Sequence, residues 1–234
     1  MLKTISRSKT PTVLVPFINI HTHQISAHPS EIIVSDYFTT LPQHQSQLYC
    51  YSAGLHPWLI NEIKIETLFK ELQMAAAHKN CVAIGECGLD KLKGPSIQVQ
   101  LAIFEQQLLL AIDLKKPVIV HCVQAFDILL SVIKRFQNKI IFIVHGFRQN
   151  MQTAMQLVQH GAYLSFGAAL TNKNNEKLQH VFLQTPTTHI FLENDDTDCS
   201  IDKIYEEAAA IKKCELHVMK EIIFANYKKV IHHE

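Results

Sequence analysis

Short apolar runs alternate along the chain with longer segments in which apolar residues recur every three or four positions. The apolar runs predict eight strands, at 17–20, 31–37, 48–53, 81–85, 117–120, 140–144, 162–166 and 189–193. The helical spacing predicts helices at 61–78, 96–114, 125–136, 150–160 and 174–184, and one or two more over 201–229 with a break near Cys214. This alternation indicates a parallel α/β sheet, and eight strands fit a (β/α)8 TIM-type barrel.

The alternation is weakest over residues 24–47, where Pro29 and Pro42 interrupt the pattern and no helix follows the first strand. We therefore expect a barrel that is trimmed in its first two units. A length of 234 residues fits a single domain. We assign residues 1–16 to an N-terminal extension and 17–234 to the barrel.

Composition narrows the functional classes. Lys and Arg total 22 against 21 Asp and Glu, so the net charge of +1 gives no basic excess for wrapping long duplex nucleic acid, although a small local patch stays open. None of the six cysteines forms a Cys-x-x-Cys pair, which argues against a zinc ribbon. Several lie inside apolar runs, where a reduced cysteine acts as a small core residue, so we expect a reducing compartment. We find no signal peptide and no run of the roughly 20 apolar residues that span a bilayer. We expect a cytoplasmic protein with no membrane partner and no obligate protein partner.

Side chains of the kinds that bind metal ions follow five of the apolar runs. These residues are His21, His23, Glu86, His121, His145 and Asp195. The carboxyl ends of parallel strands meet at one end of an α/β barrel, where active sites are assembled. The first two histidines, two positions apart on a strand, would point to the same face.

Each of these residues also has a purely structural explanation. A histidine at the end of an apolar run is often a core or turn residue, and a carboxylate there is often solvated. Asp195 could instead cap the helix predicted to begin near Ile201. The repeated position at strand ends favours a metal site, and Gly85 and Gly88 beside Glu86 indicate close backbone packing. Four histidines and two carboxylates suffice for two divalent ions that share Glu86, and such a site lowers the pKa of a bound water to about 7.

These residues lie within motifs that resemble the TatD family of metal-dependent deoxyribonucleases, in the amidohydrolase superfamily of α/β barrels. The resemblance extends from Phe17 to Tyr227. Its elements are His21-Thr-His23, Gly54-Leu-His-Pro57, Ala83-Ile-Gly-Glu-Cys-Gly-Leu-Asp90, Pro117-Val-Ile-Val-His121, Val144-His145, Tyr163-Leu-Ser-Phe-Gly167 and Leu192-Glu-Asn-Asp195.

The resemblance implies a role for each matching residue. It implies that one metal ion is surrounded by His21, His23, Glu86 and Asp195, and the other by Glu86, His121 and His145. It makes Asp195 the base that activates water, with Glu86 shared between the ions, and it places His56 near a substrate phosphate, unless that histidine is only a turn residue. Imidazole ligands favour Zn²⁺ or Mn²⁺, whereas the nucleases of the family are associated with Mg²⁺, so the metal stays open.

The sequence departs from the family pattern at three positions near the site. The family's His-Cys-Phe element is His145-Gly-Phe147 here. Asn19 stands where the family often has an aspartate, which could alter the orientation of the ligands. Val123 stands where an arginine is common. Arg148 could replace that arginine on the substrate phosphate, or it could be a solvated loop charge.

Other residues near the motifs are predicted either to have one of two roles or to support the site. Trp58 could stack on a nucleobase or pack in the core. Asp90 is expected to order a loop, and Glu193 to support the ligands or to pair with a lysine. Strand alternation points Cys87 and Cys122 away from the metal face, as packing residues.

Three hypotheses for the function follow from the predicted ligands and motifs. The first is hydrolysis of phosphodiester bonds in DNA, with DNA ends or single-stranded DNA as the substrate and cleavage of the single-strand or 3′ exonuclease type. The second keeps the two metal ions in an amidohydrolase-type esterase, lactonase or phosphotriesterase, because the fold alone does not choose the bond. The third is a binding or scaffold protein with a vestigial site, which the intact ligand set disfavours.

Overall fold

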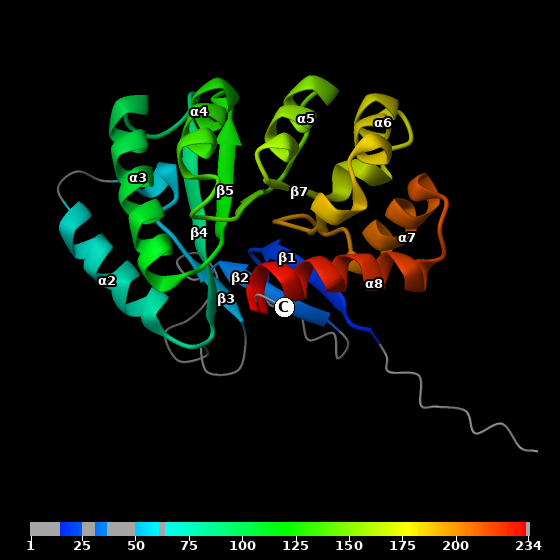
Figure 1. Cartoon of the computed structure of the whole chain (residues 1–234), viewed down its shortest axis with the longest axis horizontal. Helices are drawn as coiled ribbons and strands as arrows, with labels where there is room; N and C mark the ends of the chain where they lie inside the picture. Colours follow the sequence, from blue (N-terminus) through cyan, green and yellow to red (C-terminus); the bar gives the residue numbers. More distant parts are fainter. Residues whose placement is uncertain (1–14, 25–30, 37–49, 61–63, 233–234) are drawn as a thin grey trace, which may run out of the picture.

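The computed structural model describes residues 15–24, 31–36, 50–60 and 64–232. Its centre is one eight-stranded parallel sheet with the strands in chain order (Figure 1). They are β1 (Phe17–Thr22), β2 (Glu31–Asp36), β3 (Tyr51–Ala53), β4 (Cys81–Asp90), β5 (Val118–Val123), β6 (Phe142–Val144), β7 (Tyr163–Phe166) and β8 (Ile190–Leu192). Each strand overlaps one of the eight predicted ones.

The sheet closes on itself where the end of β1 meets the segment after β8. Thr22 and Asp195 form a parallel bridge. The N–H of His23 donates to the carbonyl of Asp195 at 3.1 Å, and the N–H of Asp195 donates to the carbonyl of His21 at 3.2 Å. The predicted barrel class is therefore confirmed, and its closure takes place at the candidate ligands themselves.

Helices cover the outside of the barrel (Figure 1). They are α2 (Ile65–Ala77), α3 (Ile97–Leu114), α4 (Phe126–Phe136), α5 (Met151–Gln159), α6 (Glu176–Gln184), α7 (Ile201–Lys212) and α8 (Leu216–Tyr227). The predicted break near Cys214 is confirmed, because Lys213 adopts a left-handed conformation with φ of 55° and ends α7. Side chains of Asn150 and Asn175 cap the first turns of α5 and α6, as asparagine commonly does.

The prediction of trimmed first units concerns mainly residues 25–30 and 37–49, which lie outside the described residues, as do residues 1–14 of the predicted N-terminal extension. Within 24–47 the structure describes Gln24 and strand β2. The division into an extension and a barrel therefore stays a prediction.

Side chains of helix α3 contact the chain at the carboxyl ends of β3 and β4. By length and apolar composition alone it is the one helix among the described residues that could cross a membrane, yet Phe104 and Leu108 are fully buried against the barrel. Its buried Gln107 exchanges hydrogen bonds with the backbone of Leu55, and its buried Gln100 does the same with the backbone of Asp90. Both contacts fix chain segments that carry residues of the candidate site.

Candidate metal centre

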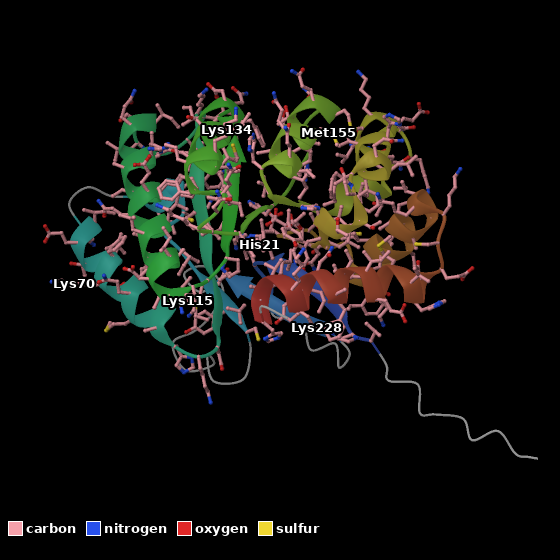
Figure 2. All side chains as sticks on the ribbon, viewed as in Figure 1. His21, Lys70, Lys115, Lys134, Met155 and Lys228 are labelled. Atoms are coloured by element: carbon pink, nitrogen blue, oxygen red, sulfur yellow. The ribbon has the colours of Figure 1, made fainter. Side chains whose placement is uncertain are left out.

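The predicted ligands converge at the carboxyl end of the barrel. His21 lies near the end of β1, Glu86 lies in β4 and His121 in β5. His145 directly follows β6, and Asp195 lies between β8 and α7. Figure 2 labels His21, which lies among the side chains in the middle of the view, within the ring of helices. The strands thus bring together side chains that are up to 174 positions apart in sequence.

Close backbone packing sets the position of Glu86. A Cβ atom on Gly88 would lie 2.0 Å from the carbonyl oxygen of His121, and one on Gly85 would lie 2.5 Å from that of Ile119. Both glycines have positive φ values, +147° and +144°, which other residues rarely adopt. Glycine on either side of Glu86 therefore lets β4 approach β5 and brings the carboxylate beside His121.

One group of donor atoms surrounds one oxygen of Glu86. The Nε2 atoms of His21 and His23 lie 3.2 and 3.4 Å from Glu86 Oε2. Asp195 Oδ1 lies 3.7 Å from the first nitrogen and 3.4 Å from the second. Two imidazole nitrogens and two carboxylate oxygens at this spacing fit the coordination shell of a divalent transition metal.

The environment of His21 supports this interpretation. Its side chain is fully buried, and within the described part of the chain neither ring nitrogen has a hydrogen-bond partner. A buried polar atom without a partner costs about 1–3 kcal/mol. A cation between the Nε2 lone pair and the carboxylates of Glu86 and Asp195 would offset that cost, which is why the residues present fit a metal ion.

A second group surrounds the other oxygen of Glu86. His121 Nδ1 lies 2.6 Å from Glu86 Oε1, and His145 Nε2 lies 2.7 Å from the same oxygen. The two nitrogens are 3.4 Å apart. Glu86 is almost fully buried, so its two oxygens face the two donor groups rather than solvent.

Two buried carboxylates hold the histidines of this second group. Asp90 Oδ2 lies 3.3 Å from His121 Nε2, which leaves Nδ1 of that ring to face Glu86. Glu193 Oε1 lies 3.5 Å from His145 Nδ1 and accepts the N–H of Gly146 at 2.6 Å. Asp90 also accepts the N–H groups of Leu92 and Lys93 in the following loop, so its predicted loop-ordering role is confirmed. Its contact with His121 is a second role that was not predicted.

The buried charges shift one another's pKa values. Burial opposes the charged form of Glu86, but the charge of His145 and the hydrogen bonds from His121 and His145 prevail and hold its pKa well below the usual 4.5. Burial likewise opposes protonation of His145, but Glu86 and Glu193 prevail and raise its pKa well above 6.5. The pKa of Asp195 is raised above 3.8, chiefly by burial. A carboxylate with a raised pKa is a stronger proton acceptor.

His56 faces the same centre as a hydrogen-bond donor. Its Nδ1 accepts the backbone N–H of Trp58 at 3.1 Å. The neutral ring therefore carries its proton on Nε2, which lies 3.2 Å from Glu86 Oε1. A donor in this position suits an anionic substrate group better than a metal ion.

Two cavities adjoin the ligands and share His121, His145 and Asp195 in their walls. The first, of about 200 Å³, is also lined by His23, His56, Trp58, Leu59, Glu86 and Asp196. The second, of about 290 Å³, is also lined by Cys122, Val123, Gln124, Gly146, Arg148 and Gln149. The exposed Arg148 thus lines the same cavity as Val123, the position of the family arginine.

The structure also places the cysteines and the asparagine that lie next to the predicted ligands in sequence. Cys87 is fully buried, as expected of a packing residue, and its thiol contacts the carbonyl of Ile119 in the neighbouring strand. Cys122 packs partly against the core and also lines the second cavity, and burial raises the pKa of its thiol to about 12. Asn19 exchanges hydrogen bonds with Asn194, linking β1 to the segment that carries Asp195. No sequence pattern predicted this pair or the contact between Asp90 and His121.

Comparison with known proteins agrees with the geometry. Residues 33–232 match the model of the family described as TatD related DNase. Over 166 residues the chain is 30% identical to the uncharacterized metal-dependent hydrolase YjjV of Escherichia coli, and over 146 residues it is 31% identical to an uncharacterized metal-dependent hydrolase of Buchnera aphidicola. These matches cover 69% and 62% of this chain but only 63% and 54% of those relatives.

Solved structures share the fold. The crystal structure of the E. coli TatD homolog YjjV has a TM-score of 0.76 at 21% identity, and that of a TatD family hydrolase from Entamoeba histolytica has 0.74 at 16%. In both cases the match covers 92% of this chain and 98% of the other.

Proposed function

Because the chain belongs to the TatD related DNase family, we propose that it is a metal-dependent hydrolase and that it cleaves phosphodiester bonds in DNA. The proposed substrates are DNA ends or single-stranded DNA. The observation that carries the proposal is the position of Glu86, because one of its oxygens faces His21 and His23 and the other faces His121 and His145. A single buried carboxylate that serves both groups suits two divalent ions, with Mg²⁺, Mn²⁺ and Zn²⁺ as the candidates.

Each ion has its own proposed ligands within this arrangement. His21, His23 and Asp195 would hold one ion together with Glu86, and His121 and His145 would hold the other with the same carboxylate. Bound ions supply a water of lowered pKa and positive charge that stabilises the phosphoryl transition state.

Asp195 is the proposed proton acceptor. Its raised pKa and its partly exposed side chain, 28% accessible, place a basic carboxylate where the ligands meet the first cavity. It therefore accepts the proton of the attacking water. His56 in the wall of the first cavity and Arg148 in the wall of the second donate hydrogen bonds to the phosphate oxygens.

Overall charge supports a small contact with DNA. With a net charge of +1, the chain lacks the positive field that long duplex binding uses. Recognition of a strand end or a short single strand needs only a few phosphate contacts, which Arg148 and Lys93 near the two cavities can provide.

The test measures cleavage and metal content together. Single-stranded DNA labelled separately at each end is incubated with the purified protein and Mg²⁺, Mn²⁺ or Zn²⁺, and the products are sized. Glu86→Gln should abolish cleavage and lower the metal content, whereas the exposed control Glu66→Gln on α2 should change neither. Metal-loaded wild type that cleaves no phosphodiester would contradict the proposal.

A second candidate function rests on Val123. An apolar side chain here lines the second cavity where the family often carries an arginine, which favours a less anionic substrate. An esterase, lactonase or phosphotriesterase would use the same donor groups. Comparing chromogenic carboxylic esters, lactones and phosphotriesters with phosphodiesters separates the two functions by the ratio of their kcat/KM values.

A further inference from the structure

The only tryptophan of the chain lies in the wall of the first cavity rather than in the core. Trp58 belongs to the short 3-10 helix η1 (Pro57–Leu59) and is 48% exposed. About half of the indole surface, which is largely apolar, is therefore in contact with water next to the buried ligands. The core-packing alternative for this residue is therefore wrong.

The ring is held in one orientation. Its Nε1–H donates to Asp90 Oδ2 at 2.7 Å, and its backbone N–H donates to His56 at 3.1 Å. The rings of His56 and His121 meet it edge to face, at centroid distances of 4.8 and 5.8 Å. With its polar N–H satisfied, the indole has only its π-face left to offer a ligand, and little side-chain entropy would be lost on binding.

A cationic side chain covers this face, and an exposed apolar one lies in the same cavity wall. Leu59, the residue after Trp58, is 46% exposed. The ammonium of Lys93 lies 3.9 Å from the centre of the indole. Lys93 is exposed and has a flexible stem, so a flat ring can displace it from the indole while its charge moves to a neighbouring anion.

We propose that Trp58 is a stacking subsite for the nucleobase of the nucleotide whose phosphate occupies the metal centre. This inference rests on the proposed phosphodiesterase function and adds a specificity-determining residue to it. Asp90 is the positioning residue, because the same carboxylate oxygen contacts both the indole N–H and the ring of His121. The indole and the His121 ring lie 5.8 Å apart in the wall of one cavity, so a nucleotide bound there can place its base on the indole and its phosphate at the metal centre. Because an abasic nucleotide has no ring to stack, this subsite selects nucleotides that carry a base.

Fluorescence of the single tryptophan reports stacking without any catalysis. The metal-loaded protein (Mg²⁺ or Zn²⁺) is titrated with thymidine 5′-monophosphate and, separately, with deoxyribose 5-phosphate. We expect the nucleotide to quench the emission and the sugar phosphate to leave it unchanged. Equal effects of the two ligands, or no effect of either, would overturn the subsite.

Kinetics on two oligonucleotides give the second readout. One is a normal single strand, and the other carries abasic residues throughout, so the polarity of cleavage need not be known. Stacking on an aromatic side chain predicts a preference of about 5- to 150-fold in kcat/KM for the base-bearing strand.

Two variants separate stacking from the hydrogen bond to Asp90, because both lose the indole N–H and only one keeps an aromatic face. Trp58→Phe should keep most of the preference, and Trp58→Leu should lose it by slowing only the base-bearing strand. Met74→Ala, an exposed apolar control on α2, should behave as wild type.

The outcomes keep the two proposals distinct. If Trp58→Leu slows both strands equally, the indole has a merely structural role and the subsite is wrong, while the nuclease function stands. If wild type cleaves neither strand, the nuclease function fails, and the fluorescence titration alone decides whether Trp58 stacks on a nucleotide.

Discussion

Asp90 Oδ2 lies 3.3 Å from Nε2 of His121, and the opposite nitrogen of that ring lies 2.6 Å from Glu86. A carboxylate on one side of an imidazole fixes the tautomer that presents a lone pair on the other side. The relationship makes Asp90 a determinant of metal affinity, although it belongs to neither donor group.

We therefore expect Asp90→Asn to weaken metal binding by about 10- to 100-fold, since loss of such a supporting carboxylate has this effect in other metal sites. Competition with a chromophoric chelator measures the affinity. Asp113→Asn, an exposed site on α3, is the matched control. An unchanged affinity in Asp90→Asn would show that the contact does not orient His121.

Metal binding should strengthen as pH rises. The pKa of His145 in the metal-free site lies well above 6.5, because Glu86 and Glu193 outweigh the effect of burial. A metal ion must displace that proton, so the apparent affinity should increase by up to about tenfold per pH unit for each proton released. Calorimetry in buffers of different ionisation enthalpy counts the protons, and a count of zero at neutral pH would contradict this assignment.

The stability of the metal-free protein should depend on pH in two windows. The raised pKa of His145 contributes stability that is present below about pH 6.5 and is lost as pH rises through the raised value. The lowered pKa of Glu86 contributes stability that is present above about pH 4.5 and is lost as pH falls through the lowered value. Thermal unfolding in EDTA should therefore show a lower Tm on both sides of a maximum, and added Zn²⁺ should raise Tm most on the alkaline side.

Gly88→Ala should destabilise the protein by about 2–5 kcal/mol, because the new Cβ meets the carbonyl of His121 and the backbone conformation is strained. Gly161→Ala is the control: its φ of +81° is also strained, but its Cβ has no neighbour within 4 Å, so about 1–2 kcal/mol is expected. Urea denaturation measures both. Equal losses would mean that the strands can move apart at no cost.

Arg148→Ala should raise KM for single-stranded DNA by roughly 10- to 100-fold with a smaller change in kcat, since a hydrogen bond to a charged group contributes about 1.5–3 kcal/mol. Arg135→Ala on α4 removes the same charge far from the cavities and should leave KM unchanged. A KM unaffected by either change would assign Arg148 to solvent.

Much of this fold could be predicted from the local spacing of apolar residues along the chain. Apolar runs gave all eight strands, and helical spacing gave the helices and the break before Leu216, because these signals depend on neighbours within one turn or one strand. The predicted ligands could be placed at one end of the barrel for the same reason, since every parallel strand ends there.

The sequence by itself determined which residues end the strands, but only the tertiary structure decided what each side chain faces. The sharing of Glu86, the contact of Asp90 with His121, the exposure of Trp58 and the closure of the barrel at Thr22 and Asp195 all join distant segments. Their geometry depends on strand register and on close approaches such as that at Gly88, which no local periodicity encodes.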